Sequence, residues 1–321
     1  MLLIAGAATA TSGLRAQQKA IPVIGYLSSF SPPPNLDDPF YAGLRETGFM
    51  PGQNVAFEYR WAEGRYERLP ALAADLVHHK VDLIKTAGGT PAALAAKSAT
   101  STIPIVFTNV GDPVGSGVVT GLARPGGNIT GVSNMSLELT AKRLELISEL
   151  VPEARVIALL VNPTSAYTEP MIGVAQDAAR ERGLQLPILK ASRESEIDAA
   201  FATLVQLQAG ALVVGADPFF NSRREQVVAL ASHRAVPTIY ERREYAVSGG
   251  LITYGPSLAA LNELDREAGI YAGRILKGEN PADLPVQRPS KFELVINLNT
   301  AQALGLTIPP SILGRADEVI E

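Results

Sequence analysis

The chain alternates short runs rich in β-branched residues with longer Ala- and Leu-rich stretches of helical period. This alternation restricts the fold most, because parallel strands need long crossovers and these are usually helices. It predicts an α/β fold with parallel sheets covered by helices on both faces. In the first half we expect strands at residues 23–27, 54–59, 83–86 and 105–108, and helices at residues 39–47, 66–78 and 91–99.

After Gly131 the same pattern begins again. Here we expect strands at residues 156–161, 185–189, 211–214, 238–240 and 251–254, and helices at residues 140–150, 170–182, 194–207 and 222–233. Each series has the size of an ordinary domain and can bury its own core. The sequence therefore predicts two doubly wound parallel-sheet lobes, the first lobe at residues 21–130 and the second lobe at residues 131–254.

Residues 124–131 combine Gly and Pro in a way that a helix interior does not tolerate, and we expect the hinge between the lobes there. Further on, residues 258–276 predict a long helix with a glycine cap, and residues 292–297 predict one more strand. We expect residues 255–321 to cross between the lobes, with part of this tail returning to the first.

Composition excludes several function classes. The chain has 321 residues, of which 46% are hydrophobic and 19% charged, so a compact globular protein is expected rather than a disordered one. The formal net charge is -4 and no basic stripe occurs, which argues against nucleic acid as a partner. There is no cysteine, and the 3 histidines are scattered, so we expect neither a metal site nor a cofactor.

Residues 1–11 read MLLIAGAATAT, which is long enough for the apolar region of a secretory signal and too short to span a bilayer. Small residues follow, and cleavage after Ala16 is expected. We therefore predict an exported protein with residues 1–20 as a leader outside the fold. The alternative, a frayed cytoplasmic N-terminus, does not explain this apolarity.

In open parallel sheets, ligands bind beyond the carboxyl ends of the strands. The residues that follow the predicted strands are short polar side chains and aromatic rings. As ligand-binding candidates we take Ser28, Ser29, Thr90, Asn109, Asp112, Asn162, Tyr167, Asp217, Phe219, Tyr240 and Tyr254. Each has a plain structural alternative, because Asp and Asn before Pro commonly cap turns and aromatic rings at strand ends commonly close the core.

Thr90 and Pro91 predict a helix start whose backbone N–H groups attract a carboxylate. We therefore expect a small carboxylate-bearing solute, with Phe219 or Tyr240 against its apolar body. If the solute is an amino acid, Asp217 or Asp112 must face its ammonium group. If it is a plain aromatic or aliphatic acid, those carboxylates are caps that accept from backbone amides.

Catalytic motifs are absent from the sequence. Residues 115–117 lie in a glycine-rich stretch that lacks the lysine and the spacing of a nucleotide loop, so we expect a flexible loop and no catalytic residue. Two alternatives to a binding protein remain open. One is an enzyme that uses Asp112, Asp217 or Glu241 in the cleft, and the other is a ligand-sensing domain that signals through a separate receptor.

Three blocks carry a family resemblance: IPVIGYLSS at residues 21–29, VFTNVGDPV at 106–114 and RPGGNITGV at 124–132. Together they resemble the ABC transporter substrate-binding proteins of the tryptophan/tyrosine-binding type. The resemblance implies a periplasmic, type I-like binding protein, expected as a monomer, that closes on a small ligand and presents it to a membrane permease. It also implies polar ligand contacts after the strands of both lobes. These fall on Ser28, Ser29, Thr90, Asn109 and Asp112 in the first lobe and on Asn162, Asp217 and Tyr240 in the second.

Overall fold

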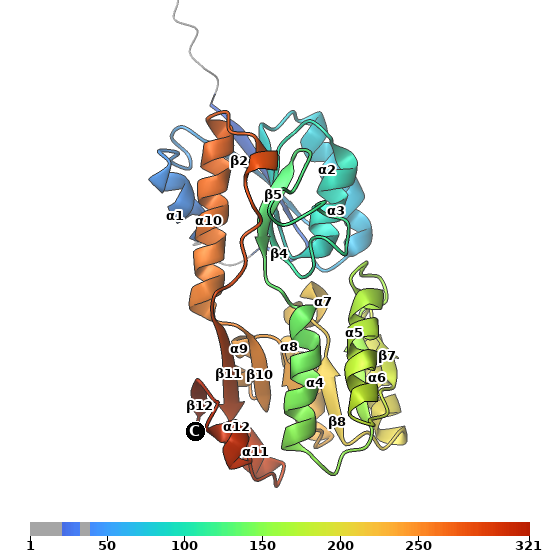
Figure 1. Cartoon of the computed structure of the whole chain (residues 1–321). Coiled ribbons are helices and arrows are strands. Elements are labelled where there is room, and N and C mark those ends of the chain that lie inside the picture. Colours follow the sequence, from blue (N-terminus) through green and yellow to red (C-terminus); the bar gives the residue numbers. More distant parts are fainter. Residues whose placement is uncertain (1–20, 33–38) are drawn as a thin grey trace, which may run out of the picture.

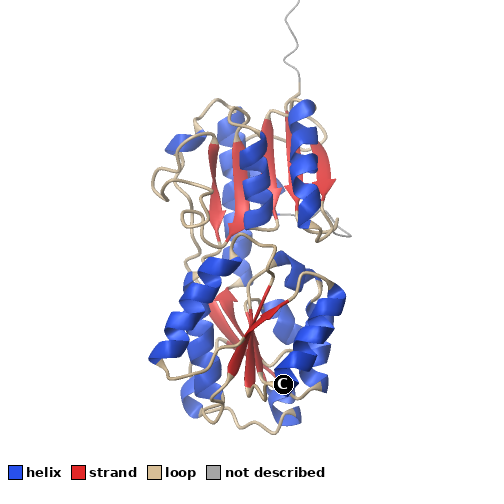
Figure 2. Cartoon of the chain, turned by 90° about the vertical axis from the view of Figure 1, so that its right-hand side faces the viewer, coloured by secondary structure: helices blue, strands red, loops and turns tan. Residues whose placement is uncertain are grey.

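The computed structural model describes residues 21–32 and 39–321, which form two α/β lobes placed end to end (Figure 1). The predicted leader at residues 1–20, with its cleavage site, lies outside the described residues. Each lobe has one central sheet with helices on both faces, as the view turned by 90° also shows (Figure 2). The predicted fold of two doubly wound lobes is therefore confirmed.

The first lobe has a parallel sheet with the strand order β2-β1-β3-β4-β5. Its strands are β1 (Val23–Ser28), β2 (Ala56–Trp61), β3 (Leu83–Ala87), β4 (Ile105–Val110) and β5 (Ile129–Ser133). Its helices are α1 (Pro39–Glu46), α2 (Leu69–His78), α3 (Thr90–Ala99) and α10 (Leu258–Leu276), with the 3-10 turns η1 (Tyr66–Arg68) and η2 (Pro281–Asp283). Because successive strand residues point to opposite faces, Ile84 packs with α2 and α3 whereas Leu83 packs with α1 and α10.

The second lobe has the strand order β12-β11-β10-β9-β8-β6-β7, with β11 antiparallel to β10 and the other pairs parallel. Its strands are β6 (Ile157–Val161), β7 (Ile188–Lys190), β8 (Ala211–Val214), β9 (Thr238–Tyr240), β10 (Ile252–Pro256), β11 (Phe292–Asn297) and β12 (Glu318–Ile320). Its helices are α4 (Glu138–Leu150), α5 (Thr168–Glu181), α6 (Glu194–Gln206), α7 (Pro218–Ser222), α8 (Arg224–His233), α9 (Arg243–Val247), α11 (Leu298–Ala303) and α12 (Pro310–Leu313). Among the described residues, no helix combines the length and apolarity needed to cross a membrane.

The structure differs from the hinge predicted at residues 124–131, because this segment lies inside the first lobe. It leads into β5, where Ile129 is in register with Ile105 of β4. Asn128 Nδ2 also ties the segment to the lobe by donating to the carbonyl of Ile103 at 2.6 Å. Gly and Pro here form a turn before an edge strand, and such a turn has the same composition as a hinge.

The chain instead passes between the lobes at residues 134–137, again between β10 and α10, and a third time before β11 (Figure 1). The first lobe therefore extends to Ser133, a few residues beyond the predicted boundary. The C-terminal tail divides between the lobes, since α10 packs against α1 in the first lobe while β11 and β12 extend the sheet of the second.

Candidate functional site

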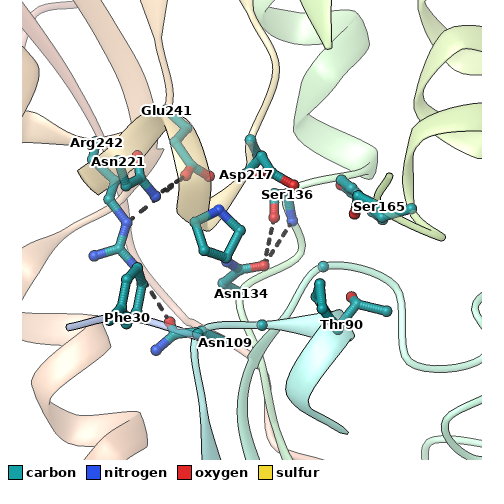
Figure 3. A pocket seen from close by; sticks show the side chains of 17 residues that line it. Phe30, Thr90, Asn109, Asn134, Ser136, Ser165, Asp217, Asn221, Glu241 and Arg242 are labelled. Atoms are coloured by element: carbon teal, nitrogen blue, oxygen red, sulfur yellow. Dashed lines mark hydrogen bonds and ion pairs between the residues drawn. The ribbon is translucent and has the colours of Figure 1, made fainter. Parts of the chain in front are cut away.

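A cavity of about 390 Å³ lies between the lobes, at the carboxyl ends of strands from both sheets (Figure 3). Residues that follow β1, β3, β4, β5, β6, β8 and β9 line it: Phe30, Gly88, Gly89, Thr90, Pro91, Asn109, Gly111, Asn134, Ser136, Ser165, Tyr167, Ala216, Asp217, Pro218, Asn221, Glu241 and Arg242. The strand ends thus meet at one cavity, as expected for parallel sheets.

The first lobe presents the N-terminus of α3 to this cavity. Gly89 is the N-cap, with φ +78°, and no side chain caps the helix. Thr90 is therefore the first residue of the helix and not its cap, and Pro91 follows it. Because a helix start leaves its first N–H groups without intrahelical partners, α3 offers donors and a positive dipole end at the cavity.

Asn109 turns the backbone at the end of β4, with φ +60°, a conformation that Asn tolerates better than most residues. Its side chain lies in the cavity wall, and Arg242 Nη2 of the second lobe is 3.5 Å from its Oδ1. The next lining residue, Gly111, faces Tyr167 of the second lobe. A Cβ on Gly111 would lie 2.8 Å from the Tyr167 ring, so the close approach of the lobes there requires glycine.

Asp217 accepts more hydrogen bonds than any other described side chain of the cavity wall. It caps α7, and its Oδ1 accepts from Phe219 N at 2.9 Å, Asn162 Nδ2 at 3.0 Å and the Tyr66 hydroxyl of the first lobe at 2.7 Å. No described residue donates to Oδ2, and Asp217 lines the cavity. Burial raises the pKa of Asp217 to about 6, although the donated hydrogen bonds oppose this rise.

Glu241 follows β9 and is buried beside Asp217. Its Oε1 accepts from Asn221 Nδ2 at 2.7 Å and lies 3.9 Å from Arg242 Nε (Figure 3). The negative charge of Glu241 also contributes to the raised pKa of Asp217. Among the described lining residues, the charged ones are these two carboxylates and Arg242, and they all belong to the second lobe.

Four of the predicted binding residues line the cavity: Thr90, Asn109, Tyr167 and Asp217. Asn162 lies directly behind it, because its amide holds Asp217 while its Oδ1 accepts from Thr164 N at 3.1 Å. The remaining predicted residues do not appear in the cavity wall.

In the first lobe, Ser28 and Ser29 are fully buried beneath the wall, where Ser28 Oγ accepts from Phe30 N at 3.0 Å. Asp112 closes a turn instead, since its Oδ1 accepts from Gly115 N at 2.8 Å. This is the structural alternative stated for Asp112, and its physical reason is that the carboxylate reaches unpaired amides of its own loop first.

Three of the four aromatic candidates of the second lobe, all but Tyr167, are absent from the cavity wall. Phe219 lies in the core under α7 and α8. Tyr240 stacks on Tyr245 with 4.5 Å between ring centroids. Tyr254 packs near Phe292, and its carbonyl accepts from Arg143 Nε at 2.8 Å. The Phe219 and Tyr240 rings thus belong to the core of the lobe, and the half-buried Tyr254 packs against its edge.

Several lining residues were not among the predicted binding residues. Asn134 and Ser136 follow β5, which was not recognised because Gly and Pro precede it. The β-branched run at residues 129–133 was the available signal. Asn221 falls just before the helix predicted at residues 222–233 and was not considered. Tyr66, which contacts Asp217 from outside the wall, was assigned to the helix predicted at residues 66–78, and a helical pattern does not show which side chains reach another lobe. The described residues hold no cluster of three His, Asp or Glu suited to a metal ion.

Two α/β lobes with a polar cavity between them define the fold of type I periplasmic binding proteins. The sequence model for "ABC transporter substrate binding protein" matches residues 36–320. The chain is also 31% identical over 268 residues to a tyrosine-binding protein of Clostridioides difficile (strain R20291), covering 83% of this chain and 75% of that protein. The chain therefore belongs to the family of ABC transporter substrate-binding proteins.

Two solved structures differ in how well they superpose. A domain from Streptococcus pneumonia in complex with L-Trp is 29% identical and has a TM-score of 0.79, covering 92% of this chain and 100% of that chain. The ligand-free, open structure of a substrate binding protein from Clostridium difficile is 27% identical, with a TM-score of 0.63 and coverage of 94% and 99%. At similar identity, this chain therefore superposes better on the ligand-bound structure than on the open one.

Proposed function

We propose that this chain is the extracytoplasmic binding component of an ABC importer and that it closes on an amino acid with an aromatic or apolar body. One observation carries the proposal. In a single interlobe cavity, two carboxylates of the second lobe lie across from the uncapped N-terminus of α3 in the first. An α-amino acid has the complementary pair of charges.

The charge of the cavity favours an amino acid over a plain acid. Arg242 and the fully buried Arg143 interact with Glu241, whereas no cation is among the groups that shift the pKa of Asp217, so the wall is negative at Asp217. An ammonium group offsets this charge in a site from which water is excluded, whereas a second anion without an ammonium group adds repulsion. Asp217 fits both alternatives stated from the sequence, because Oδ1 acts as a cap while Oδ2 accepts from no described residue and the side chain lines the cavity.

The two charged ends lie close enough for one small solute. A Cβ on Gly89 at the start of α3 would be 3.5 Å from Pro218, which follows Asp217. We therefore place the ligand carboxylate at the N–H groups of α3 and its ammonium at Asp217 Oδ2 and Glu241. Phe30 and Tyr167 are the aromatic residues of the described wall, and they suit an aromatic side chain.

The relatives support this class of ligand, since one is named for tyrosine and another holds L-Trp. Family membership supports delivery to a membrane permease, and the apolar leader supports export to the periplasm. The same membership favours binding without turnover over the enzymatic alternative. The resemblance to the ligand-bound relative supports the closed state as the one described here.

The test begins with mass spectrometry of any solute that the purified chain retains. Calorimetric titration then compares L-tryptophan and L-tyrosine with tryptamine, which lacks the carboxylate, and indole-3-propionate, which lacks the ammonium. We expect the amino acids to bind at least tenfold more tightly than either analogue, because each analogue leaves one charged subsite unpaired. An uncharged sugar or a metal chelate as the tight ligand would refute the assignment, and chemical turnover of the ligand would favour an enzyme.

A further inference from the structure

Tyr66 connects the two lobes although its ring does not line the ligand cavity. It lies in η1 of the first lobe, and its hydroxyl donates to Asp217 Oδ1 at 2.7 Å and accepts from Phe219 N at 3.1 Å, both in the second lobe. The loop before it also approaches the second lobe, because a Cβ on Gly64 would lie 3.9 Å from Ser222 Oγ of α7. We call this contact the Tyr66–Asp217 bridge.

The bridge uses one oxygen of a cavity-lining carboxylate, and no described residue donates to the other oxygen. Tyr66 donates to Oδ1, beside the donors Asn162 and Phe219 of the second lobe itself. Those two donors remain with Asp217 when the lobes separate. The Tyr66 hydroxyl, in contrast, reaches Asp217 only when the lobes are in contact. Asp217 therefore takes part both in the contact between the lobes and in the cavity wall.

We propose that the Tyr66–Asp217 bridge couples ligand binding to lobe closure, with Tyr66 as a positioning residue that acts on the ligand through Asp217. The proposal rests on the proposed function in one respect, namely that the ligand carries a cation to Asp217 Oδ2. It adds what that function does not specify, namely which first-lobe residue forms a stronger hydrogen bond when a ligand cation is bound to Asp217.

The coupling follows from hydrogen-bond strength. A cation at Oδ2 keeps Asp217 ionised, and a hydroxyl donating to an ionised carboxylate forms a stronger bond than one donating to a neutral acid. The Tyr66 hydroxyl remains a donor throughout the ordinary pH range, because burial and the nearby Asp217 raise its pKa. In the other direction, donation from Tyr66 favours the ionised form of Asp217 that the cation needs. Such coupling is reciprocal by thermodynamic linkage.

A Tyr66→Phe variant tests the bridge, since it keeps the ring and removes only the hydroxyl. Tyr59→Phe is the matched control, because the Tyr59 hydroxyl pairs with that of Tyr41 at 2.9 Å within the first lobe. The chain has no cysteine, so Ala71→Cys and Gln176→Cys, at exposed positions of α2 and α5, allow specific spin labelling of the two lobes. Pulsed electron resonance then measures the interlobe distance with and without L-tryptophan.

We expect Tyr66→Phe to bind L-tryptophan about tenfold more weakly and release it correspondingly faster, and to keep a larger open fraction at saturation than Tyr59→Phe. In an Asp217→Asn background the same substitution has a smaller effect, because the bond it removes is no longer charge-assisted. Equal closed fractions and equal affinities in Tyr66→Phe and Tyr59→Phe overturn the proposal.

Failure of the proposed function gives a different result. If the unsubstituted chain binds neither L-tryptophan nor L-tyrosine nor any other amino acid, the ligand assignment fails. The interlobe distances of the labelled proteins without ligand still test the bridge. If the bridge stabilises closure, the closed population is smaller in Tyr66→Phe than in Tyr59→Phe. Identical distance distributions of the two ligand-free variants then overturn it as well.

Discussion

The two lobes line one cavity with different chemistry. The first lobe contributes backbone and neutral groups: the glycines and the start of α3, Thr90, and Asn109 at a positive φ. The second lobe contributes the charged side chains of the described wall, Asp217, Glu241 and Arg242. One lobe therefore offers a fixed dipole and the other offers titratable charge.

Under the proposed function, this difference lets one cavity accommodate both ends of a zwitterion. The helix start bears no ionisable group, so the first lobe needs no counter-ion while the lobes are apart. The carboxylates of the second lobe are already held by Asn162 and Asn221 of the same lobe. Closure then brings together two half-sites that are each stable alone.

The largest expected effect comes from removing charge from the second lobe. Asp217→Asn keeps an oxygen for the donors at Oδ1 but replaces the charged Oδ2 with an amide. Loss of one partner from a buried charged pair costs roughly 2–5 kcal/mol, so L-tryptophan binding should weaken by at least tenfold. Indole-3-propionate should not lose affinity, because the substitution removes a like charge. In calorimetry, Asp112→Asn, which changes a turn outside the cavity wall, serves as the control, and equal losses in both variants would contradict the assignment.

The second effect is a pH dependence that the first lobe cannot produce. The pKa of Asp217 is raised to about 6, and the groups that face it are Tyr66, Asn162, the Phe219 amide and Glu241. Below pH 6 a cationic ligand must displace a proton from Asp217, so affinity should fall as pH falls, by about tenfold between pH 7.5 and pH 5. Titrations across this range check the slope. An Asp217→Asn protein with the same slope would assign the proton to another group.

A smaller effect is expected from the backbone of the first lobe. Gly89→Ala places a Cβ 3.3 Å from the Asn109 carbonyl and 3.5 Å from Pro218, which disturbs the start of α3. We expect a several-fold loss of amino-acid affinity. Gly52→Ala is the control, because Gly52 also has φ +78° but no neighbour within 4 Å. Both changes cost roughly 1–3 kcal/mol of stability. Binding losses of equal size would show that strain alone is responsible.

The smallest effect on ligand affinity is expected from a substitution in the core of the second lobe, away from the cavity. Tyr240→Phe keeps the ring that stacks on Tyr245 and should leave ligand affinity within about twofold. Thermal melting and calorimetry on the same protein check this. A loss beyond about fivefold would show that Tyr240 contacts the ligand after all.

Much of the fold could be predicted because it depends on local patterns. The alternation of apolar runs predicted the strands around Val23, Leu83, Ile105 and Ala211 and the helices between them. The short elements β5, β12, α9, α11 and α12 were not predicted. Of these, β5 follows a Gly- and Pro-rich turn, and its first residues were attributed to a hinge. Composition identifies such a turn but does not distinguish an edge of a sheet from a passage between lobes.

The candidate site could be predicted only in part. Thr90, Asn109, Tyr167 and Asp217 follow strands and line the cavity, because strand polarity alone directs those loops to one edge. Phe219 and Tyr240 also follow strands yet point into the core. Which way a side chain turns after a strand depends on the neighbouring helices, and the order of residues does not contain that information.

By itself, the sequence determined the class of fold, the pair of lobes and the edge at which polar residues collect, because hydrophobic period and strand direction are local properties. Only the tertiary structure decided which lobe supplies charge and that Tyr66 reaches Asp217, 151 positions away in the chain. Contacts between lobes depend on how two separately formed cores are placed against each other. That placement is set by packing, burial and hydrogen bonding between the lobes. No local pattern of residues along the chain predicts these contacts.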